Sequence, residues 1–430
     1  MKKNNIENLP ELQGRFNHTY LDGICLAVNA IPDSYLLLDA PQCGYDRACS
    51  LYVAHDLFSD LIRNGSNHRI CCTSVGGGQN IIRDRSDNIA QLLRKVGREK
   101  DCSAIFLAAI PMAFITGMQY DNIARKVQKY LKAPLIQTQA GSLRGDWLDG
   151  YDETLLAIAG KLDLRRDLKK RNNVAIAGYL FDRNEGDHTA NVKELGKMLK
   201  GLSLNLVSVW LNGCLFSSLR DIEKAGTIIS FPYGRRAARE ISRRTGADLL
   251  ELDLPFGLEN TRRWVNAVAV HCGRKRQAGT YLREELRKVV PLSRLLVSRY
   301  FTGRKFAFSG DPYLAYAFAG ALAELGAEVD HAIIFASRKA DRDLAPDARA
   351  GSRTLYAPLF KEAYDLDTSR TDLFVGNSYI FNLLRSKDNR KPYVELGFPS
   401  FYYHCLTESP FLGARGYINF LNRLTNAFCK

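Results

Sequence analysis

The sequence predicts an α/β protein made of three Rossmann-like domains, each with a parallel sheet flanked by helices. Two observations lead to this prediction. Short apolar runs with the character of buried strands alternate along the chain with amphipathic helical patterns, which is typical of parallel sheets covered on both faces. The length of 430 residues also exceeds what one hydrophobic core usually serves, so two or three domains are expected.

The predicted strands follow the chain in three groups. The first group comprises YLLLDA (35–40), RICCTSV (69–75), SAIFLAA (103–109) and APLIQT (133–138). The second comprises VAIAGYLF (174–181), LNLVSVW (204–210) and GTIISFP (226–232). The third comprises KFAFSG (305–310), DHAIIFA (330–336), TDLFVGN (371–377) and PYVELGF (392–398). Helical patterns such as NIARKVQKYLK and NVKELGKMLKGL lie between them.

Two breaks in this alternation indicate domain boundaries. The charged run LRRDLKKRNN (164–173) precedes a fresh strand, and a long helical segment at 273–305 leads into another. We therefore expect an N-terminal domain over 1–170, a central domain over 171–300 and a C-terminal domain over 301–430.

Composition favours a globular protein of the cytoplasm. Hydrophobic residues make up 46% and charged residues 25% of the chain, as in soluble domains. The weakly polar run at 103–117 is too short to span a bilayer and contains a proline. No apolar stretch follows the charged N-terminus, so neither a signal peptide nor a membrane role is expected. Ten cysteines in such a protein indicate free thiols or metal ligands rather than disulfides.

The formal net charge of +14 is compatible with nucleic acid, a membrane surface or an acidic protein partner. The basic residues are scattered and are not interleaved with aromatic side chains as in a single-strand binder. A solvated basic surface is therefore the preferred interpretation and nucleic-acid binding is not expected. An acidic docking partner stays open as an intermediate alternative.

The first predicted strand ends next to a cysteine. The segment PDSYLLLDAPQCGYD (32–46) places Cys43 just past the strand, in a turn started by Pro41 and relaxed by Gly44. A thiolate at such a strand end can point toward a ligand or a partner. Cys71 and Cys72 lie inside the next predicted strand, and we expect both to be core residues.

A glycine loop follows this second strand, at 74–80 (SVGGGQN). A phosphate loop is one interpretation, and close packing of backbone is the preferred one. Because no GxxxxGK[ST] pattern occurs in the chain, we do not expect the protein to hydrolyse ATP by itself.

The segment TDLFVGNSYIFNLLRSKDNRKPYVELGFPSFYYH (371–404) is the most specific stretch of the sequence. Its Gly-Asn-Ser turn, its Gly-Phe-Pro strand end and the later Gly416-Tyr417 helix start resemble the C-terminal domain of the nitrogenase component 1 family. Gly310-Asp311-Pro312 is similar to a further turn of that family, and we expect Asp311 to cap the following helix. The resemblance extends from Tyr35 to the C-terminus and itself implies three Rossmann-like domains.

In that family the cysteine after the first strand supplies an iron–sulfur ligand at the interface between two subunits, and Cys43 matches it. The chain departs from the family where Asp39-Ala40-Pro41-Gln42 precedes the cysteine. The positions that match further cysteines hold none: residues 15–18 have no thiol, Pro111 follows the third strand, and Pro232 stands at the cofactor cysteine of catalytic subunits. Asp39 and Asp46 are lesser candidates, since a carboxylate replaces the thiol in the β-like subunit of the dark protochlorophyllide reductase.

Iron–sulfur clusters normally take four thiolates, so the resemblance implies a [4Fe–4S] cluster shared with an unlike α-like subunit, or a larger metallocluster held mainly by that partner. The pattern is closest to β-like subunits, namely the molybdenum–iron protein β subunit and the β-like subunit of the cofactor-assembly scaffold. It implies a hetero-oligomer, in the form of a heterotetramer, that receives electrons from an ATP-dependent iron protein. Reduction of a substrate and a scaffold role in cofactor maturation both stay open. The alternative is a non-redox small-molecule-binding protein built of Rossmann-like domains.

Overall fold

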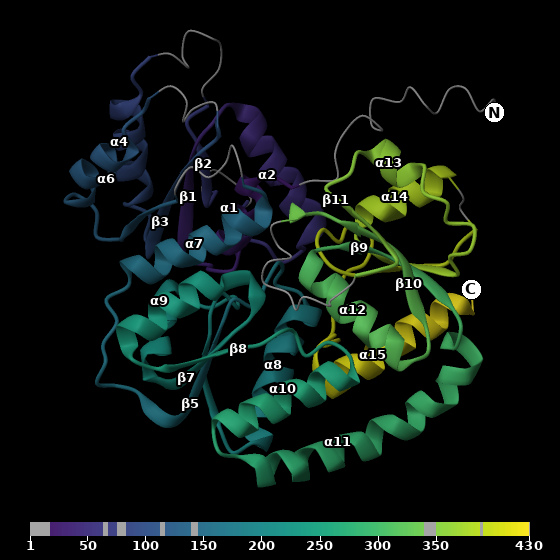
Figure 1. The fold of residues 1–430 in the computed structure, drawn as a ribbon. Helices are drawn as coiled ribbons and strands as arrows, with labels where there is room; N and C mark the ends of the chain where they lie inside the picture. Colours follow the sequence, from purple (N-terminus) through teal and green to yellow (C-terminus); the bar gives the residue numbers. More distant parts are fainter. Residues whose placement is uncertain are drawn as a thin grey trace, which may run out of the picture. The chain divides into compact units, whose positions relative to one another are not determined.

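The computed structural model describes residues 18–62, 68–74, 83–111, 117–138, 145–338, 350–387 and 390–429. Within them, three sheets with helices on their faces confirm the predicted α/β class, and every strand pair with a defined register is parallel (Figure 1). No helix in these ranges is long and apolar enough to cross a bilayer.

The first sheet has the strand order β2-β1-β3-β4. Its strands are β1 (Ser34–Asp39), β2 (Ile70–Cys72), β3 (Ala104–Ala109) and β4 (Leu135–Gln137), and the helices of this part of the chain are α1 (Tyr20–Asn29), α2 (Gln42–His55), α4 (Ser86–Val96) and α6 (Tyr120–Gln128). Because the chain places β2 on one side of β1 and β3 on the other, the strand order reverses at the carboxyl end of β1. Such switch points are where open α/β sheets bind ligands.

The second sheet repeats this order as β6-β5-β7-β8. It contains β5 (Lys170–Ala177), β6 (Asn205–Val209), β7 (Ala225–Ser230) and β8 (Asp248–Glu251), with the helices α7 (Trp147–Lys161), α8 (Gly186–Gly201), η4 (Phe216–Lys224), η5 (Pro232–Gly234) and α9 (Arg235–Thr245) along the same stretch. The sequence did not predict β8, which lies at an edge of the sheet and is partly exposed.

The third sheet has the order β11-β10-β9-β12-β13. Its strands are β9 (Lys305–Gly310), β10 (Glu328–Ile334), β11 (Arg353–Tyr356), β12 (Leu373–Gly376) and β13 (Tyr393–Glu395). The helices are α10 (Leu258–His271), α11 (Lys275–Leu296), η6 (Val297–Phe301), α12 (Pro312–Glu324), α13 (Phe360–Tyr364), α14 (Ser378–Lys387) and α15 (Gly413–Phe428). The edge strand β11 was also not predicted.

The chain forms two compact units. One comprises Thr19–His188 and Leu206–Glu251, and so carries the first sheet and nearly all of the second. The other holds the remaining described residues, including Leu252–Lys430 with the third sheet. The finer division at residues 170 and 300 stays a prediction.

Two hydrophobic cores fix the sheets. One lies where the first sheet packs against α4 and α6, and includes Leu37, Leu93, Ile105 and Val127. The other, in the second unit, includes Ile333, Phe374 and Leu383. These are apolar positions of the predicted strands and of the amphipathic helices that cover them.

Helices α1 and α7 cross at two glycines. A Cβ atom on Gly23 would lie 1.9 Å from the carbonyl oxygen of Trp147, and one on Gly150 would lie 2.0 Å from that of Tyr20. The missing side chains therefore allow backbone to touch backbone, which holds α1, and with it the start of β1, in place.

Candidate metal centre at the carboxyl end of β1

Cys43 lies at the switch point of the first sheet. After β1 ends at Asp39, Pro41 caps the 14-residue helix α2, and Cys43 is the second residue of that helix. The predicted turn is thus corrected, because Gly44 already belongs to the helix. The Cys43 side chain is exposed. The thiol at the start of this helix is therefore reachable from solvent.

Cys72 is the residue that sequence reasoning missed at this site. In the register of β1 and β2 it lies beside Leu38, and its thiol donates to the carbonyl oxygen of Ala40 at 2.8 Å. Burial raises the pKa of this thiol, and the charges of Asp39 and Cys43 raise it further. We expected Cys72 to be a core residue, but its side chain is only partly buried. The neighbouring Cys71 does pack against the first core.

Asp39, the last residue of β1, forms a buried network. Its carboxylate is fully buried and accepts from Arg85 Nη2 at 2.8 Å, from the Tyr120 hydroxyl at 2.5 Å and from the Thr73 hydroxyl at 2.8 Å. The hydrogen bond to Asp39 raises the pKa of the Arg85 guanidinium. Burial, followed by the bond to Asp39, raises the pKa of Tyr120. Asp39 is thus committed to protein groups and is not free to ligate a metal.

The structure also shows where the other candidate positions of the sequence lie. Asp46 lies one turn into α2 and accepts from the Gln42 side chain at 3.1 Å. Pro111 follows β3 at the same sheet edge, since Ala109 is the register partner of Asp39. Pro232 begins a short buried turn after β7. Residues 15–17 and the glycine loop at 75–80 lie outside the described residues.

The remaining thiols of the first domain are not comparable to Cys43. Burial raises the pKa of Cys25 and of Cys49, and it raises that of Cys102 to about 12. In the described part of the chain no group of three or more His, Cys, Asp or Glu side chains could hold a metal ion. These residues therefore offer part of a cluster site at most.

A second ionisable cluster lies at the end of β5 in the same unit. Asp182 Oδ1 lies 2.6 Å from His188 Nε2, and the Asp182 carbonyl lies 3.2 Å from His55 Nε2 at the end of α2. Tyr179 contacts the other nitrogen of His188 at 3.0 Å, and Arg183 pairs with Asp187. All these side chains are buried. No exposed thiol adjoins them among the described residues, so the cluster has the features of a structural network.

The turns of the C-terminal sheet that the sequence singled out are structural as well. Asp311 accepts from the backbone of Leu314 at 2.9 Å and caps α12, as predicted. Asn377 of the Gly-Asn-Ser turn donates to the carbonyl of Phe398 at 3.2 Å. The two most specific pieces of the sequence therefore bond to each other.

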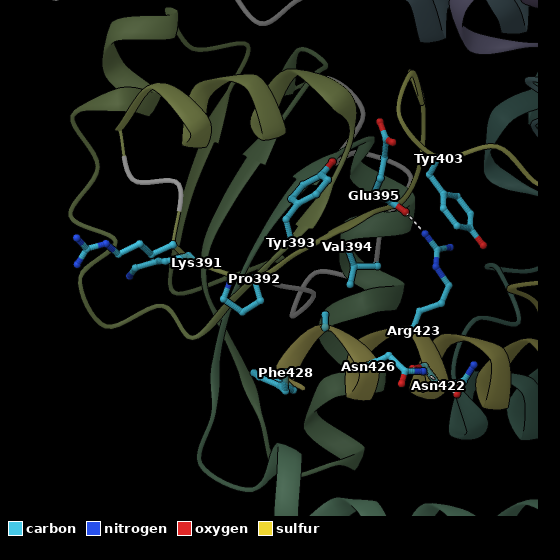
Figure 2. Close-up of a pocket in the computed structure, with 12 residues that line it drawn as sticks. Lys391, Pro392, Tyr393, Val394, Glu395, Tyr403, Asn422, Arg423, Asn426 and Phe428 are labelled. Atoms are coloured by element: carbon cyan, nitrogen blue, oxygen red, sulfur yellow. Dashed lines mark hydrogen bonds between the residues drawn. The ribbon is translucent and has the colours of Figure 1, made fainter. Parts of the chain in front are cut away.

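A cavity of about 580 Å³ lies between β13 and α15 (Figure 2). The positively charged side chains that line it already bond to other groups of the protein. Arg423 bonds the Glu395 carbonyl and lies 3.8 Å from the centre of the Tyr403 ring, and the Lys391 ammonium bonds the carbonyls of residues 368, 369 and 371. The cavity contains no thiol, so it does not compete with the β1 site for a metal.

We compared the sequence and the fold with those of known proteins. The sequence profile of the family described as "Nitrogenase component 1 type Oxidoreductase" matches residues 20–429. The nitrogenase molybdenum-iron protein beta chain of Bradyrhizobium diazoefficiens is 26% identical over 310 residues, which are 65% of this chain and 58% of that one. Subunit N of the light-independent protochlorophyllide reductase of Gloeobacter violaceus is 22% identical over 350 residues, covering 72% and 70% of the two chains.

A solved structure of nitrogenase Cp1 at pH 6.5 has the same fold, with a TM-score of 0.80 at 16% identity, and the match covers 97% of this chain and 93% of that one. The three sheets, the switch-point thiol and the match over nearly the whole sequence agree. The chain belongs to the nitrogenase component 1 type oxidoreductase family.

Proposed function

We propose that this chain is the β-like subunit of a nitrogenase component 1-type complex, in which Cys43 ligates a [4Fe–4S] cluster shared with an unlike α-like subunit. One observation carries the proposal: an exposed thiol stands at the N-terminus of α2, at the switch point of the first sheet. Similarity to a molybdenum-iron protein beta chain supports the choice of subunit.

The donor set fits a shared cluster. A thiolate is the ordinary ligand of iron–sulfur clusters, and such clusters take four. Cys43 offers one exposed thiol and Cys72, at the end of β2, a partly buried one, while the described residues contain no complete set. The partner would have to supply the rest, and a larger metallocluster held mainly by the partner agrees with the same geometry.

The surrounding residues have defined tasks in this proposal. Cys43 binds the cluster from the first turn of α2. The network of Asp39, Arg85 and Tyr120 fixes the end of β1, from which α2 starts. Bound in this place, the cluster would supply one-electron transfer.

The wider assembly is part of the proposal. We infer a heterotetramer with the α-like subunit, and an ATP-dependent iron protein as the electron donor. All ten cysteines are free thiols, which suits a reducing compartment such as the cytoplasm. Within this assembly the complex either reduces a substrate or acts as a scaffold for cofactor maturation. Membership of the family favours both over a non-redox small-molecule-binding protein.

The proposal is tested by anaerobic purification of the chain alone and together with its unlike subunit, followed by iron and acid-labile sulfide analysis. We expect the isolated chain to be poor in iron and the complex to contain iron and sulfide in equal amounts. An isolated homodimer with a full complement of iron and sulfide would contradict the shared site, and a complex without iron would contradict the redox role.

A further inference from the structure

The long helix α11 carries a row of arginines on its outer side. Its buried residues, Ala278, Tyr281, Glu285, Val289 and Ser293, form the side that packs against α10 and α15 (Figure 1). On the opposite side lie Arg276, Arg283, Arg287 and Arg294, and all four are exposed. We call these four residues the α11 arginine row.

The spacing of the row places its four arginines on one side of the helix, although Pro291 lies in the helix between Arg287 and Arg294. The arginines follow one another at intervals of 7, 4 and 7 residues, and an α-helix turns by roughly 100° per residue, so all four lie within roughly 40° of one another. The row extends over about 27 Å at 1.5 Å per residue. It is therefore a single surface and not a scatter of charges around the helix.

The row is not neutralised by carboxylates of the described chain. No ion pair of any of the four arginines occurs among the described residues, and the hydrogen bond from Arg283 Nε goes to a backbone carbonyl, that of Gly279 at 3.1 Å. The carboxylate of α11 that is buried, Glu285, is taken by Lys197 at 2.8 Å and Lys288 at 2.9 Å.

Arginines on the two helices that precede α11 in the sequence behave differently. On α9, Arg239 pairs with Glu251 at 2.6 Å and Arg243 with Glu240 at 2.7 Å. On α10, Arg262 and Arg263 both pair with Glu259. Because paired arginines are usual on these helices, an aligned and unpaired row on α11 is a distinct feature of the surface.

We propose that the α11 arginine row is a docking surface for an acidic protein partner, whose carboxylates form a matching row on a helix. The arginine guanidinium binds carboxylates with two parallel hydrogen bonds, which suits this chemistry. A partner helix with glutamates at intervals of 7, 4 and 7 residues would present one carboxylate to each arginine.

The observations favour a protein over the other anionic partners. A helix that lies on a membrane turns its apolar side to the lipid. The buried side of α11 instead packs against α10 and α15, and its exposed leucines, Leu292 and Leu295, lie only at its C-terminal end. A single-stranded nucleic acid needs aromatic side chains for stacking, and the aromatic residue of α11, Tyr281, is buried.

The test measures binding of the full chain to a labelled helical peptide of about 22 residues, with glutamates at intervals of 7, 4 and 7, a length that matches the row. A peptide of the same composition, with its glutamates distributed around the helix, serves as the ligand control. We expect the matched peptide to bind about tenfold more tightly than the control at low salt, and less tightly as salt is added.

Charge reversal locates the surface. Arg283→Glu/Arg287→Glu should weaken binding of the matched peptide about tenfold or more. The control Arg98→Glu/Lys100→Glu changes the net charge equally at two exposed residues outside α11, and should keep the affinity. No preference for the matched peptide, or equal losses in both variants, would overturn the proposal. Tighter binding of phosphatidylglycerol vesicles or of a single-stranded DNA with the same dependence on Arg283 and Arg287 would also overturn it.

Discussion

A buried charge network lies at the end of β1 and another at the end of β5, and the two differ in what surrounds them. At β1 the carboxylate of Asp39 is held by Arg85 and Tyr120, and the exposed thiol of Cys43 follows in the first turn of α2. At β5 the carboxylate of Asp182 lies next to two histidines, and the side chains of this network are buried. Helix α2 begins at the first and ends in the second, because His55 is its last residue. Buried charge alone therefore does not make a functional site. An exposed thiol in the helix that follows the strand distinguishes the end of β1.

The largest expected effect is a loss of stability, without a loss of iron, when the network at β5 is disrupted. Asp182→Ala removes the counter-charge of His188, whose side chain is 6% exposed. Removing one partner of a buried ion pair leaves the other charge uncompensated, which lowers the free energy of unfolding by about 3–5 kcal/mol. Urea unfolding followed by circular dichroism should show a loss of this size, while iron per folded complex stays unchanged. A stable variant that has lost its iron would reverse the roles of the two networks.

A somewhat smaller loss is expected at β1. Arg85→Leu leaves the carboxylate of Asp39 buried without a cation, at a cost of about 3 kcal/mol. The double variant Asp39→Asn/Arg85→Leu removes the stranded charge and should recover part of this loss in the same unfolding measurement. If the double variant is less stable than the single one, the pair is not the source of the stability.

The two histidines at β5 should give opposite dependences of stability on pH. Burial lowers the pKa of His55 from 6.5, so its neutral form stabilises the fold above pH 6.5 and this contribution is lost as pH falls below that value. For His188, burial opposes protonation but the charges of Asp182 and Asp187 outweigh it, so the pKa is raised from 6.5. Its contribution is complete below pH 6.5 and is lost as pH rises through the folded-state pKa.

Each histidine is tested by its own substitution. His55→Gln should flatten the acid side of the stability profile, and His188→Gln the alkaline side, each by up to about 1.4 kcal/mol per pH unit. Chemical denaturation across the pH range measures both slopes. The same change of slope in both variants would contradict the assignment.

A smaller effect distinguishes the two thiols at β1. The Cys72 thiol donates to the Ala40 carbonyl, and a hydroxyl in its place keeps that hydrogen bond. Cys72→Ala should lower iron per complex and Cys72→Ser should restore it, if the thiol positions the segment before Cys43. An equal loss in both variants would make the sulfur of Cys72 itself a ligand.

Much of the fold was predictable because buried strands have a strong apolar signal. The strands of the three sheet centres were found, while β8 and β11 were missed, since both are short edge strands with polar, partly exposed residues. Strand β5 also begins earlier than predicted, at Lys170, because its first residues are exposed and charged. These two edge strands bury little apolar surface, so their sequences do not stand out from loops.

The candidate site was predictable only in part. Cys43 could be found because it directly follows a strand. Arg85 and Tyr120 lie 46 and 81 residues from Asp39 in the sequence, and no local pattern connects them. One signal was available: a carboxylate at the end of an apolar strand, as in YLLLDA, requires a buried partner. Cys72 could have been found from the parallel pairing of the first two strands.

The most direct test of the central claim is the iron content of Cys43→Ala in the complex with the unlike subunit, measured with the EPR signal of the reduced state. The truncation makes a small change at an exposed position, so we expect a stability loss of about 1 kcal/mol or less. Iron and the EPR signal should fall sharply in Cys43→Ala and remain in the control variants Cys49→Ala and Cys102→Ala. A complex of Cys43→Ala with full iron and an unchanged EPR signal would contradict the assignment of Cys43 as the cluster ligand.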